Sequence, residues 1–195
     1  MLFDSLLLAT ANRHKYEEFC ELLPNRLAQK LLFAPEVAPL EVEETGTTYV
    51  MNACLKAQAW SVASGLPSLA DDSGLEVEAL SWRPGVYSAR IVGGSDADRN
   101  HWLLSQMERC LDRRAHFVAA VALVIPEQFT IACEGVCSGR LGEHETGGNG
   151  FGYDPLFIPD GYEVSFGELP METKNRISHR ARAVRHLFTI LNESS

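Results

Sequence analysis

Pro67-Ser68-Leu69-Ala70-Asp71-Asp72-Ser73-Gly74 joins a short apolar segment to two acids and a glycine. The apolar residues predict a short buried strand, and Asp71 and Asp72 are expected at its end. Residues 75–79 then alternate apolar and acidic side chains, which predicts a half-exposed strand. We therefore expect a sheet at this point of the chain, with a charged pair beside it.

Two further strands and two helices are predicted before this segment. Leu6-Leu7-Leu8-Ala9 is apolar throughout, which is typical of a strand buried on both faces, and residues 30–34 predict a second strand. Between them, apolar residues recur at helical spacing until Pro24. Thr47 or Thr48 is placed to cap a longer helix, and Gly65 to end it.

The chain after Gly74 mixes both element types. Residues 82–85 predict a turn, and Asp96 or Asp98 is expected to open a helix that runs to about Cys110. Two apolar runs, 117–125 and 129–136, predict a hairpin. One apolar face, starting at Ile177, predicts a C-terminal helix. We therefore expect an α/β fold with a mixed twisted sheet flanked by helices.

Composition limits the class of protein. The 195 residues fit a single domain, 1–195, and 46% of them are hydrophobic, which favours a folded core. The net charge of −9 disfavours nucleic acid as a partner. No apolar run is long enough to span a membrane, and residues 1–8 lack the basic flank of a signal peptide. Five cysteines without a Cys-x-x-Cys pair indicate reduced, mostly buried thiols, so we expect a cytoplasmic protein.

The segment Thr10-Ala11-Asn12-Arg13-His14-Lys15 joins the first strand to the first helix. Such a junction presents backbone N–H groups and the positive end of the helix dipole, both suited to phosphate. Lys15 opposes that dipole unless an anion binds there. An ordinary loop with a solvated lysine is the alternative.

Carboxylates that could bind a metal occur at two places. Asp71 and Asp72 lie beside a glycine, and Glu41, Glu43 and Glu44 precede Thr45-Gly46. Mg²⁺ typically takes one or two protein carboxylates together with substrate phosphates and water. Turn or cap acids and an exposed acidic loop are the structural alternatives.

Two segments suit a nucleotide base and its phosphates. Residues 147–155, Gly-Gly-Asn-Gly-Phe-Gly-Tyr-Asp-Pro, combine backbone freedom with aromatic rings that can stack on a base. Residues 174–186 hold five lysines and arginines and no acid, and Ser178 can cap a helix that starts with His179 and Arg180. A hairpin loop is the alternative for the first segment, and a solvated or RNA-binding helix for the second.

Seven elements together resemble the inosine/xanthosine triphosphate pyrophosphatases, a family that removes non-standard purine nucleotides. They span nearly the whole chain in the family's order, although Ala11 and His14 stand where that family often has glycine. The elements are Thr10-x-Asn12-x-x-Lys15, Glu43-Glu44-Thr45-Gly46, Asn52-Ala53 with Lys56-Ala57, 70–75 (ADDSGL), 84–90 (PGVYSAR), 147–155 and 174–180 (KNRISHR).

The resemblance implies an elongated, two-lobed α/β fold around a central cleft, and a homodimer. It implies hydrolysis of ITP, dITP and XTP to the monophosphate and pyrophosphate with Mg²⁺, which keeps these nucleotides out of DNA and RNA. Asp72 matches the general base and a metal ligand, and Glu43 a second ligand. Residues matching nucleotide contacts are Thr10, Ala11, Asn12, Arg13, His14, Lys15, Lys56, Ser73 and Lys174 (chiefly phosphates), and Phe151, Gly152, Tyr153, Asp154, His179 and Arg180 (the purine pocket).

Two other functions fit parts of this pattern. A related pyrophosphatase could act on pyrimidine nucleotides, against which the His179-Arg180 pair argues. A nucleotide-binding sensor without catalysis would need no water-activating carboxylate, so the complete acidic set argues against it.

Overall fold

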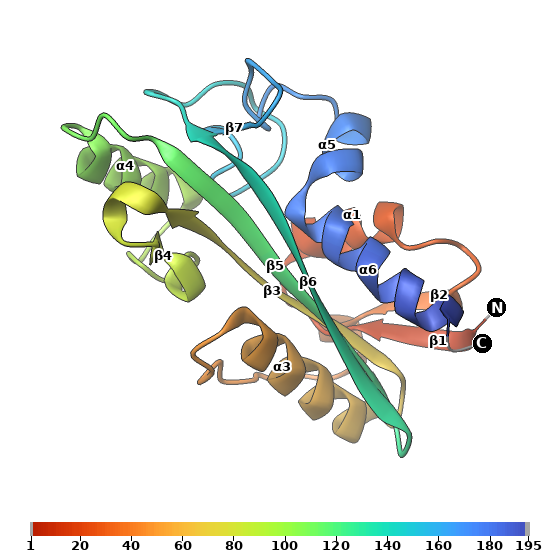
Figure 1. The fold of residues 1–195 in the computed structure, drawn as a ribbon. Helices are drawn as coiled ribbons and strands as arrows, with labels where there is room; N and C mark the ends of the chain where they lie inside the picture. Colours follow the sequence, from red (N-terminus) through yellow and green to blue (C-terminus); the bar gives the residue numbers. More distant parts are fainter. Residues whose placement is uncertain (1, 194–195) are drawn as a thin grey trace. The chain divides into compact units, whose positions relative to one another are not determined.

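A computed structural model describes residues 2–193 of the protein (Figure 1). The strands are β1 (Phe3–Leu8), β2 (Ala28–Phe33), β3 (Ser68–Val77), β4 (Arg83–Pro84), β5 (Arg114–Ile125), β6 (Phe129–Leu141) and β7 (Phe157–Pro159). The α-helices are α1 (Arg13–Leu22), α2 (Ala34–Val37), α3 (Tyr49–Ser64), α4 (Asp96–Met107), α5 (Met171–Ile177) and α6 (His179–Glu193). Short 3₁₀ helices cover Glu78–Leu80 and Gly85–Tyr87.

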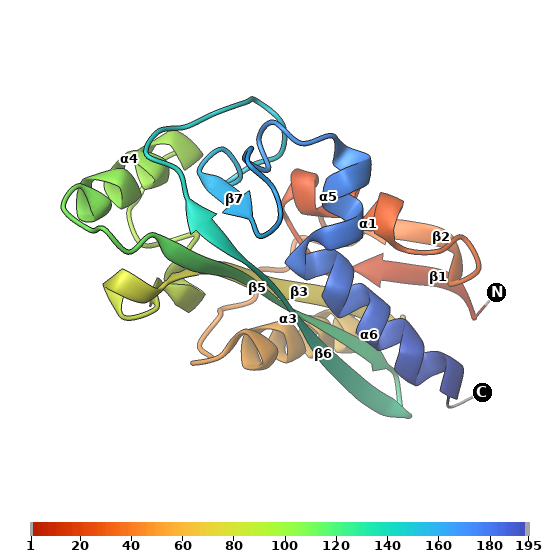
Figure 2. The same cartoon turned by 45° about the horizontal axis from the view of Figure 1, so that its top comes forward.

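The sheet is mixed, as the sequence predicts. Its strand order is β2-β1-β3-β5-β6-β7, and β4 pairs with β3. β1 runs parallel to both β2 and β3, whereas β3 with β4 and β6 with β7 are antiparallel. β1 and β2 lie side by side in both views (Figure 1, Figure 2). The α/β fold class is therefore confirmed.

Local signals fix the ends of the long helices. The Thr48 side chain accepts a hydrogen bond from Met51 N–H at the start of α3, and Gly65 ends that helix with a left-handed φ of 68°. α4 begins at Asp96, as the sequence predicts, and Ser95 caps it. Asp98 completes a capping box, since its side chain accepts from the Ser95 backbone while Ser95 accepts from Asp98 N–H.

The structure corrects four local expectations. β3 runs without a break from Ser68 to Val77, so Asp71 and Asp72 lie within a strand and not at the end of one. Ala34, the last residue of the predicted second strand, instead begins α2. Ile177 ends α5 because Ser178 is extended, so α6 starts at His179. The cysteines are less buried than expected: Cys133 and Cys137 are buried, whereas Cys20 is exposed.

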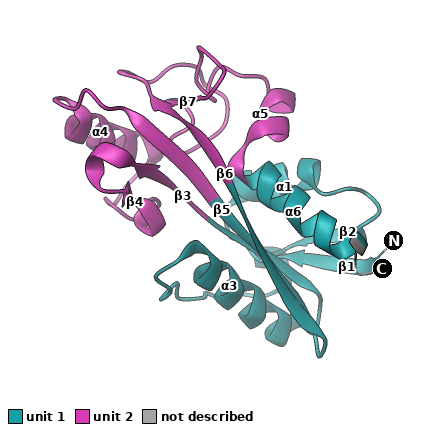
Figure 3. Cartoon of the chain, viewed as in Figure 1, with its two compact units in different colours: residues 1–72, 119–135, 180–195 teal, residues 73–118, 136–179 magenta. Residues whose placement is uncertain are grey.

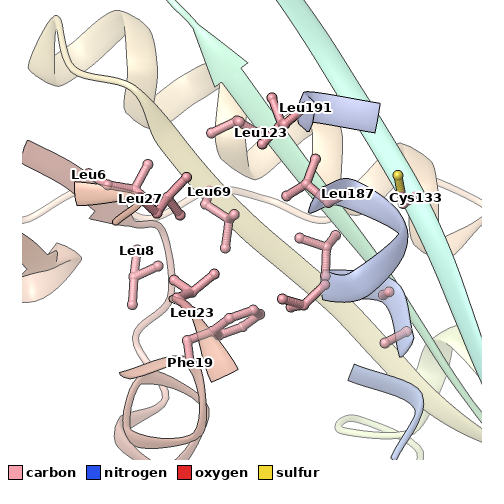
Figure 4. Packing of buried hydrophobic residues seen from close by; sticks show 14 of the residues in the cluster. Leu6, Leu8, Phe19, Leu23, Leu27, Leu69, Leu123, Cys133, Leu187 and Leu191 are labelled. Atoms are coloured by element: carbon pink, nitrogen blue, oxygen red, sulfur yellow. The ribbon is translucent and has the colours of Figure 1, made fainter. Parts of the chain in front are cut away.

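The described chain divides into two compact units, each with its own core (Figure 3). The first unit comprises residues 1–72, 119–135 and 180–195, and the second residues 73–118 and 136–179. Strand alternation in the first unit places Leu6 and Leu8 in a core with residues from α1 and α6, such as Phe19 and Leu187 (Figure 4). α3 lies on the other side of that part of the sheet from α1 and α6 (Figure 3).

The second unit is built around aromatic side chains. Phe117, Phe157 and Phe166 pack with ring centroids 4.6 to 6.2 Å apart, and Leu75, Leu103 and other apolar residues complete this core.

Among residues 2–193, no helix combines the length and the apolar character needed to cross a membrane.

Candidate functional site

Asp71 and Asp72 are consecutive residues of β3 whose carboxylates have different partners. Both side chains belong to the first unit and are buried, with 1% and 6% of their surfaces exposed. Successive strand residues point to opposite faces of a sheet, so one acid faces the α3 side and the other the α1 and α6 side. The contacts of the two carboxylates follow this division.

The Asp72 carboxylate lies against α3. Asn52 Nδ2 donates to Asp72 Oδ2 over 2.9 Å, and Lys56 Nζ lies 3.7 Å from Asp72 Oδ1. Asn52 and Lys56 are one helical turn apart, so α3 presents both on one face. Asn52 Oδ1 also accepts from Gly46 N–H over 2.8 Å, and Lys56 Nζ is 2.5 Å from Glu44 Oε1. The loop before α3 is thereby tied to the acid.

This environment favours a proton acceptor at Asp72. Burial raises the pKa of the Asp72 carboxyl above its usual range, and the charge of Glu44 adds to this effect. Lys56 and the hydrogen bond from Asn52 oppose it without reversing it. A carboxylate with a raised pKa is a stronger base than an exposed one, which suits abstraction of a proton from water.

The Asp71 carboxylate is held by cations. Lys15 Nζ lies 3.1 Å from Asp71 Oδ2, and the same oxygen accepts from Arg180 Nε at 3.2 Å and Nη2 at 3.1 Å. Burial opposes ionisation of Asp71, but the charges of Lys15, Arg180 and Lys56 hold its pKa well below the usual range. Asp71 therefore stays ionised and does not suit the role of a base.

The junction between β1 and α1 leads into the N-terminus of a helix, as the sequence predicts. Asn12 caps α1 by accepting from Lys15 N–H over 3.2 Å, and Thr10 Oγ1 accepts from Asn12 N–H over 3.1 Å. Ala11, Arg13 and His14 are exposed. These contacts place the N-terminus of a helix and the Lys15 ammonium within the same unit as both aspartates.

The glycine-rich loop of the second unit is anchored at Asp154. Its Oδ2 atom accepts from Phe151 N–H over 2.9 Å and lies 2.7 Å from Lys174 Nζ. The Lys174 ammonium lies 5.1 Å from the centre of the Phe151 ring. Tyr153 is buried, and its hydroxyl donates to Ser88 O over 3.0 Å. Asp154 and Tyr153 thus shape the loop, while Phe151 is partly exposed.

α4 holds the same loop at Gly152. Asp96 Oδ2 accepts from Gly152 N–H over 2.7 Å, and Asn100 Nδ2 donates to Gly152 O over 3.1 Å. Asn100 Nδ2 also donates to Glu145 Oε2 over 3.0 Å. Both peptide groups of one loop residue are therefore fixed by one helix.

The structure distributes the predicted residues between the units. Lys15, Lys56, Asp71, Asp72 and Arg180 come together in the first unit, and Phe151, Asp154 and Lys174 come together in the second. His179, also in the second unit, is buried and stacks on Phe117 with ring centroids 4.6 Å apart. Ser73 is partly exposed on β3.

The acids of the loop before α3 differ in their surroundings. Glu43 is exposed, whereas Glu44 is partly buried and contacts Lys56. Among residues 2–193, no three His, Cys, Asp or Glu side chains converge as a metal cluster. Asp72 with an acid from this loop still fits Mg²⁺, which needs few protein ligands when phosphates supply the rest.

Sequence reasoning missed several contact residues. Glu18, Asp96 and Asn100 gave no motif of their own, although Glu18 follows Lys15 by one helical turn, which predicts a shared face. Asn52 lay inside a recognised motif without an assigned role, and Glu44 was considered only as a metal ligand. Their roles depend on contacts between segments that are distant in sequence.

Comparison with known proteins identifies the family. The model of the Ham1 family matches residues 6–190. A Deinococcus radiodurans protein named dITP/XTP pyrophosphatase is 53% identical over 147 residues, covering 75% of this chain and 74% of that protein. A Rhodospirillum centenum protein of the same name is 45% identical over 196 residues, covering 95% of this chain and 93% of that protein.

The structural comparison agrees with this assignment. The solved structure of a HAM1 protein from Coxiella burnetii is 39% identical, has a TM-score of 0.87, and covers 99% of this chain and 100% of that one. The family match extends over nearly the whole chain and includes both aspartates of β3. The protein therefore belongs to the Ham1 family.

Proposed function

We propose that this protein hydrolyses the non-standard purine nucleoside triphosphates dITP, XTP and ITP to the monophosphate and pyrophosphate. The names of its Ham1 relatives support this activity. The observation that carries the proposal is the Asp72 carboxylate, buried between Asn52 and Lys56 with a raised pKa. Removal of these nucleotides would keep them out of DNA and RNA.

Asp72 acts as the general base in this proposal. It takes a proton from the water that attacks the α-phosphorus, and pyrophosphate leaves with the electron pair of the broken P–O bond. Asn52 fixes one oxygen of the carboxylate, which leaves the other directed toward Lys56. This geometry orients the base for transfer of a single proton.

Lysine ammonium groups and N–H donors would contact the nucleotide phosphates. Lys15, Lys56 and the N–H groups of residues 10–15 offer positive charge and donors, and Ser73 and Lys174 are the further phosphate contacts that the family resemblance implies. A triphosphate would contact the lysine ammonium groups beside the carboxylates that hold them. Positive charge at these positions stabilises the charge that develops on the transferred group.

Asp72 and Glu43 would hold Mg²⁺, and Glu44 is a further candidate because it contacts Lys56, which also lies beside Asp72. When bound, Mg²⁺ neutralises phosphate charge and polarises the phosphoryl oxygens. The assignment agrees with the oxygen-only ligand preference of this ion.

The purine would be read by Phe151, Gly152, Tyr153 and Asp154 together with His179 and Arg180. Phe151 offers a ring for stacking, and the buried Asp154 keeps the loop in place. A 6-keto purine accepts hydrogen bonds where adenine donates, so N–H donors in the pocket select against adenine.

Product analysis tests this function directly. The protein is incubated with ITP and Mg²⁺, and IMP and pyrophosphate are the expected products. Release of IDP and orthophosphate, or ITP binding without turnover, would refute it. A substrate panel with pyrimidine triphosphates distinguishes the related pyrimidine enzyme. A single domain, a homodimer and a cytoplasmic location remain predictions.

A further inference from the structure

Four charged side chains form a series of contacts that begins at Lys15 of the proposed phosphate-binding loop. Lys15 contacts Asp71, Asp71 accepts from Arg180, and Arg180 Nη1 donates to Glu18 Oε2. All four residues belong to the first unit, and the side chains of Asp71, Arg180 and Glu18 are at most 5% exposed. Cations and anions alternate in the order Lys15, Asp71, Arg180 and Glu18, so each contact joins opposite charges.

Glu18 occupies the far end of the Arg180 guanidinium. Asp71 takes the Nε and Nη2 edge, and Glu18 takes Nη1, so the planar group is held on two sides. The centre of the Phe19 ring lies 5.8 Å from the guanidinium carbon of Arg180. Phe19 is on α1, the helix that also carries Glu18. Burial alone would lower the pKa of Arg180, but the charges of Glu18 and Asp71 outweigh burial and raise the pKa above its usual value.

We propose that Glu18 is a positioning residue of the nucleotide site, which fixes Arg180 so that Asp71 holds the Lys15 ammonium where phosphates bind. This inference rests on the proposed function. It gives Asp71 a purpose other than proton transfer: an ionised carboxylate that orients a cation. Glu18 itself contacts no substrate and acts through Arg180.

The geometry separates this role from catalysis. The Asp72 carboxylate contacts Asn52 and Lys56, both on α3, whereas Glu18 and Lys15 are on α1. Loss of the Glu18 charge should therefore weaken nucleotide binding while the chemical step at Asp72 proceeds at its usual rate. A role confined to folding would change stability without changing the Michaelis constant of the folded fraction.

Steady-state kinetics with ITP and Mg²⁺ test the proposal in Glu18→Gln, which keeps the shape and removes the charge. KM should rise about tenfold, as expected when one charge-assisted contact is weakened, with kcat within about threefold of the wild type. Glu18→Asp, which keeps the charge, should give a KM between that of the wild type and that of Glu18→Gln. Glu21→Gln, an exposed acid one turn along α1, should match the wild type.

A wild-type KM in Glu18→Gln, a fall in kcat alone, or an equal change in Glu21→Gln would overturn the proposal. If Glu18→Gln does not fold, a wild-type KM in Glu18→Asp overturns it instead. If the wild type does not cleave ITP, the proposed function fails, and calorimetry with pyrophosphate and Mg²⁺ decides the inference. A Kd about tenfold weaker in the variant than in the wild type supports it, whereas equal Kd values or no binding to either refute it.

Discussion

Asp71 and Asp72 are covalent neighbours in β3, yet Arg180 and Lys15 hold the first while Asn52 and Lys56 flank the second. Cations keep the pKa of Asp71 low, whereas burial raises that of Asp72. Strand alternation is the cause, since it turns the two carboxylates toward different helices. One acid is thereby suited to structure and the other to proton transfer.

Replacement of Asp72 by asparagine should remove turnover. Asp72→Asn keeps the size of the side chain but cannot accept a proton, so kcat for ITP should fall by about a hundredfold to ten-thousandfold. Asp160→Asn, at an exposed acid, serves as the control. Product formation by quenched-flow chromatography measures the effect, and near-normal kcat in Asp72→Asn would exclude it as the base.

Asp71 should stabilise the folded protein in a pH-dependent way. Its folded pKa is depressed, so its contribution is present above the unfolded value of about 4 and is lost as pH falls below it. Asp71→Asn should lower the free energy of unfolding at pH 7 by about 3 kcal/mol, because Arg180 and Lys15 lose a buried partner.

Urea denaturation from pH 7 to pH 3 measures this dependence, with Asp4→Asn at an exposed position of β1 as the control. The difference in the free energy of unfolding between the wild type and Asp71→Asn should become smaller below pH 4. A difference that stays constant down to pH 3 would contradict the depressed pKa of Asp71.

Gly150 should tolerate no side chain. Its φ of 74° favours glycine, and an added Cβ would lie 2.1 Å from Asp154 Oδ2, the atom that contacts Lys174. Gly150→Ala should therefore raise KM for ITP by about tenfold or more through the loss of this contact. Gly161→Ala is a matched control, since Gly161 also has a positive φ, 85°, but open space around the Cβ. Equal KM values in both variants would show that the clash is unimportant.

Tyr153 should make the protein sensitive to alkali. Burial raises its pKa to about 12, above the unfolded value of about 10. The unfolded state therefore loses its proton first, and stability falls as pH rises above 10. Tyr153→Phe should lose about 1 kcal/mol at pH 8 with the bond to Ser88 O, but should show a smaller further loss at pH 11. The free energy of unfolding is measured by urea denaturation from pH 8 to pH 11. An equal decrease in the wild type and in Tyr153→Phe would contradict the raised pKa of Tyr153.

Much of the local structure follows from sequence alone. Thr48 and Gly65 bound α3 because a hydroxyl can accept a free N–H and glycine can adopt a positive φ. The β5–β6 hairpin follows from two apolar runs around Pro126. Asn12 and Lys15 mark the start of α1, where backbone donors occur whatever the rest of the fold does. These features depend on neighbours in the chain.

The separate roles of Asp71 and Asp72 depend on the tertiary structure. The sequence placed both acids at a strand end, but β3 continues through them, since it pairs with β1 at Ser68 and Leu69 before the acids and with β4 at Glu76 and Val77 after them. The partners Glu18 and Arg180 are separated by 162 positions. Local pattern cannot reveal such a pair, since only the packing of α1 and α6 on one side of the first unit brings the two charges out of water together.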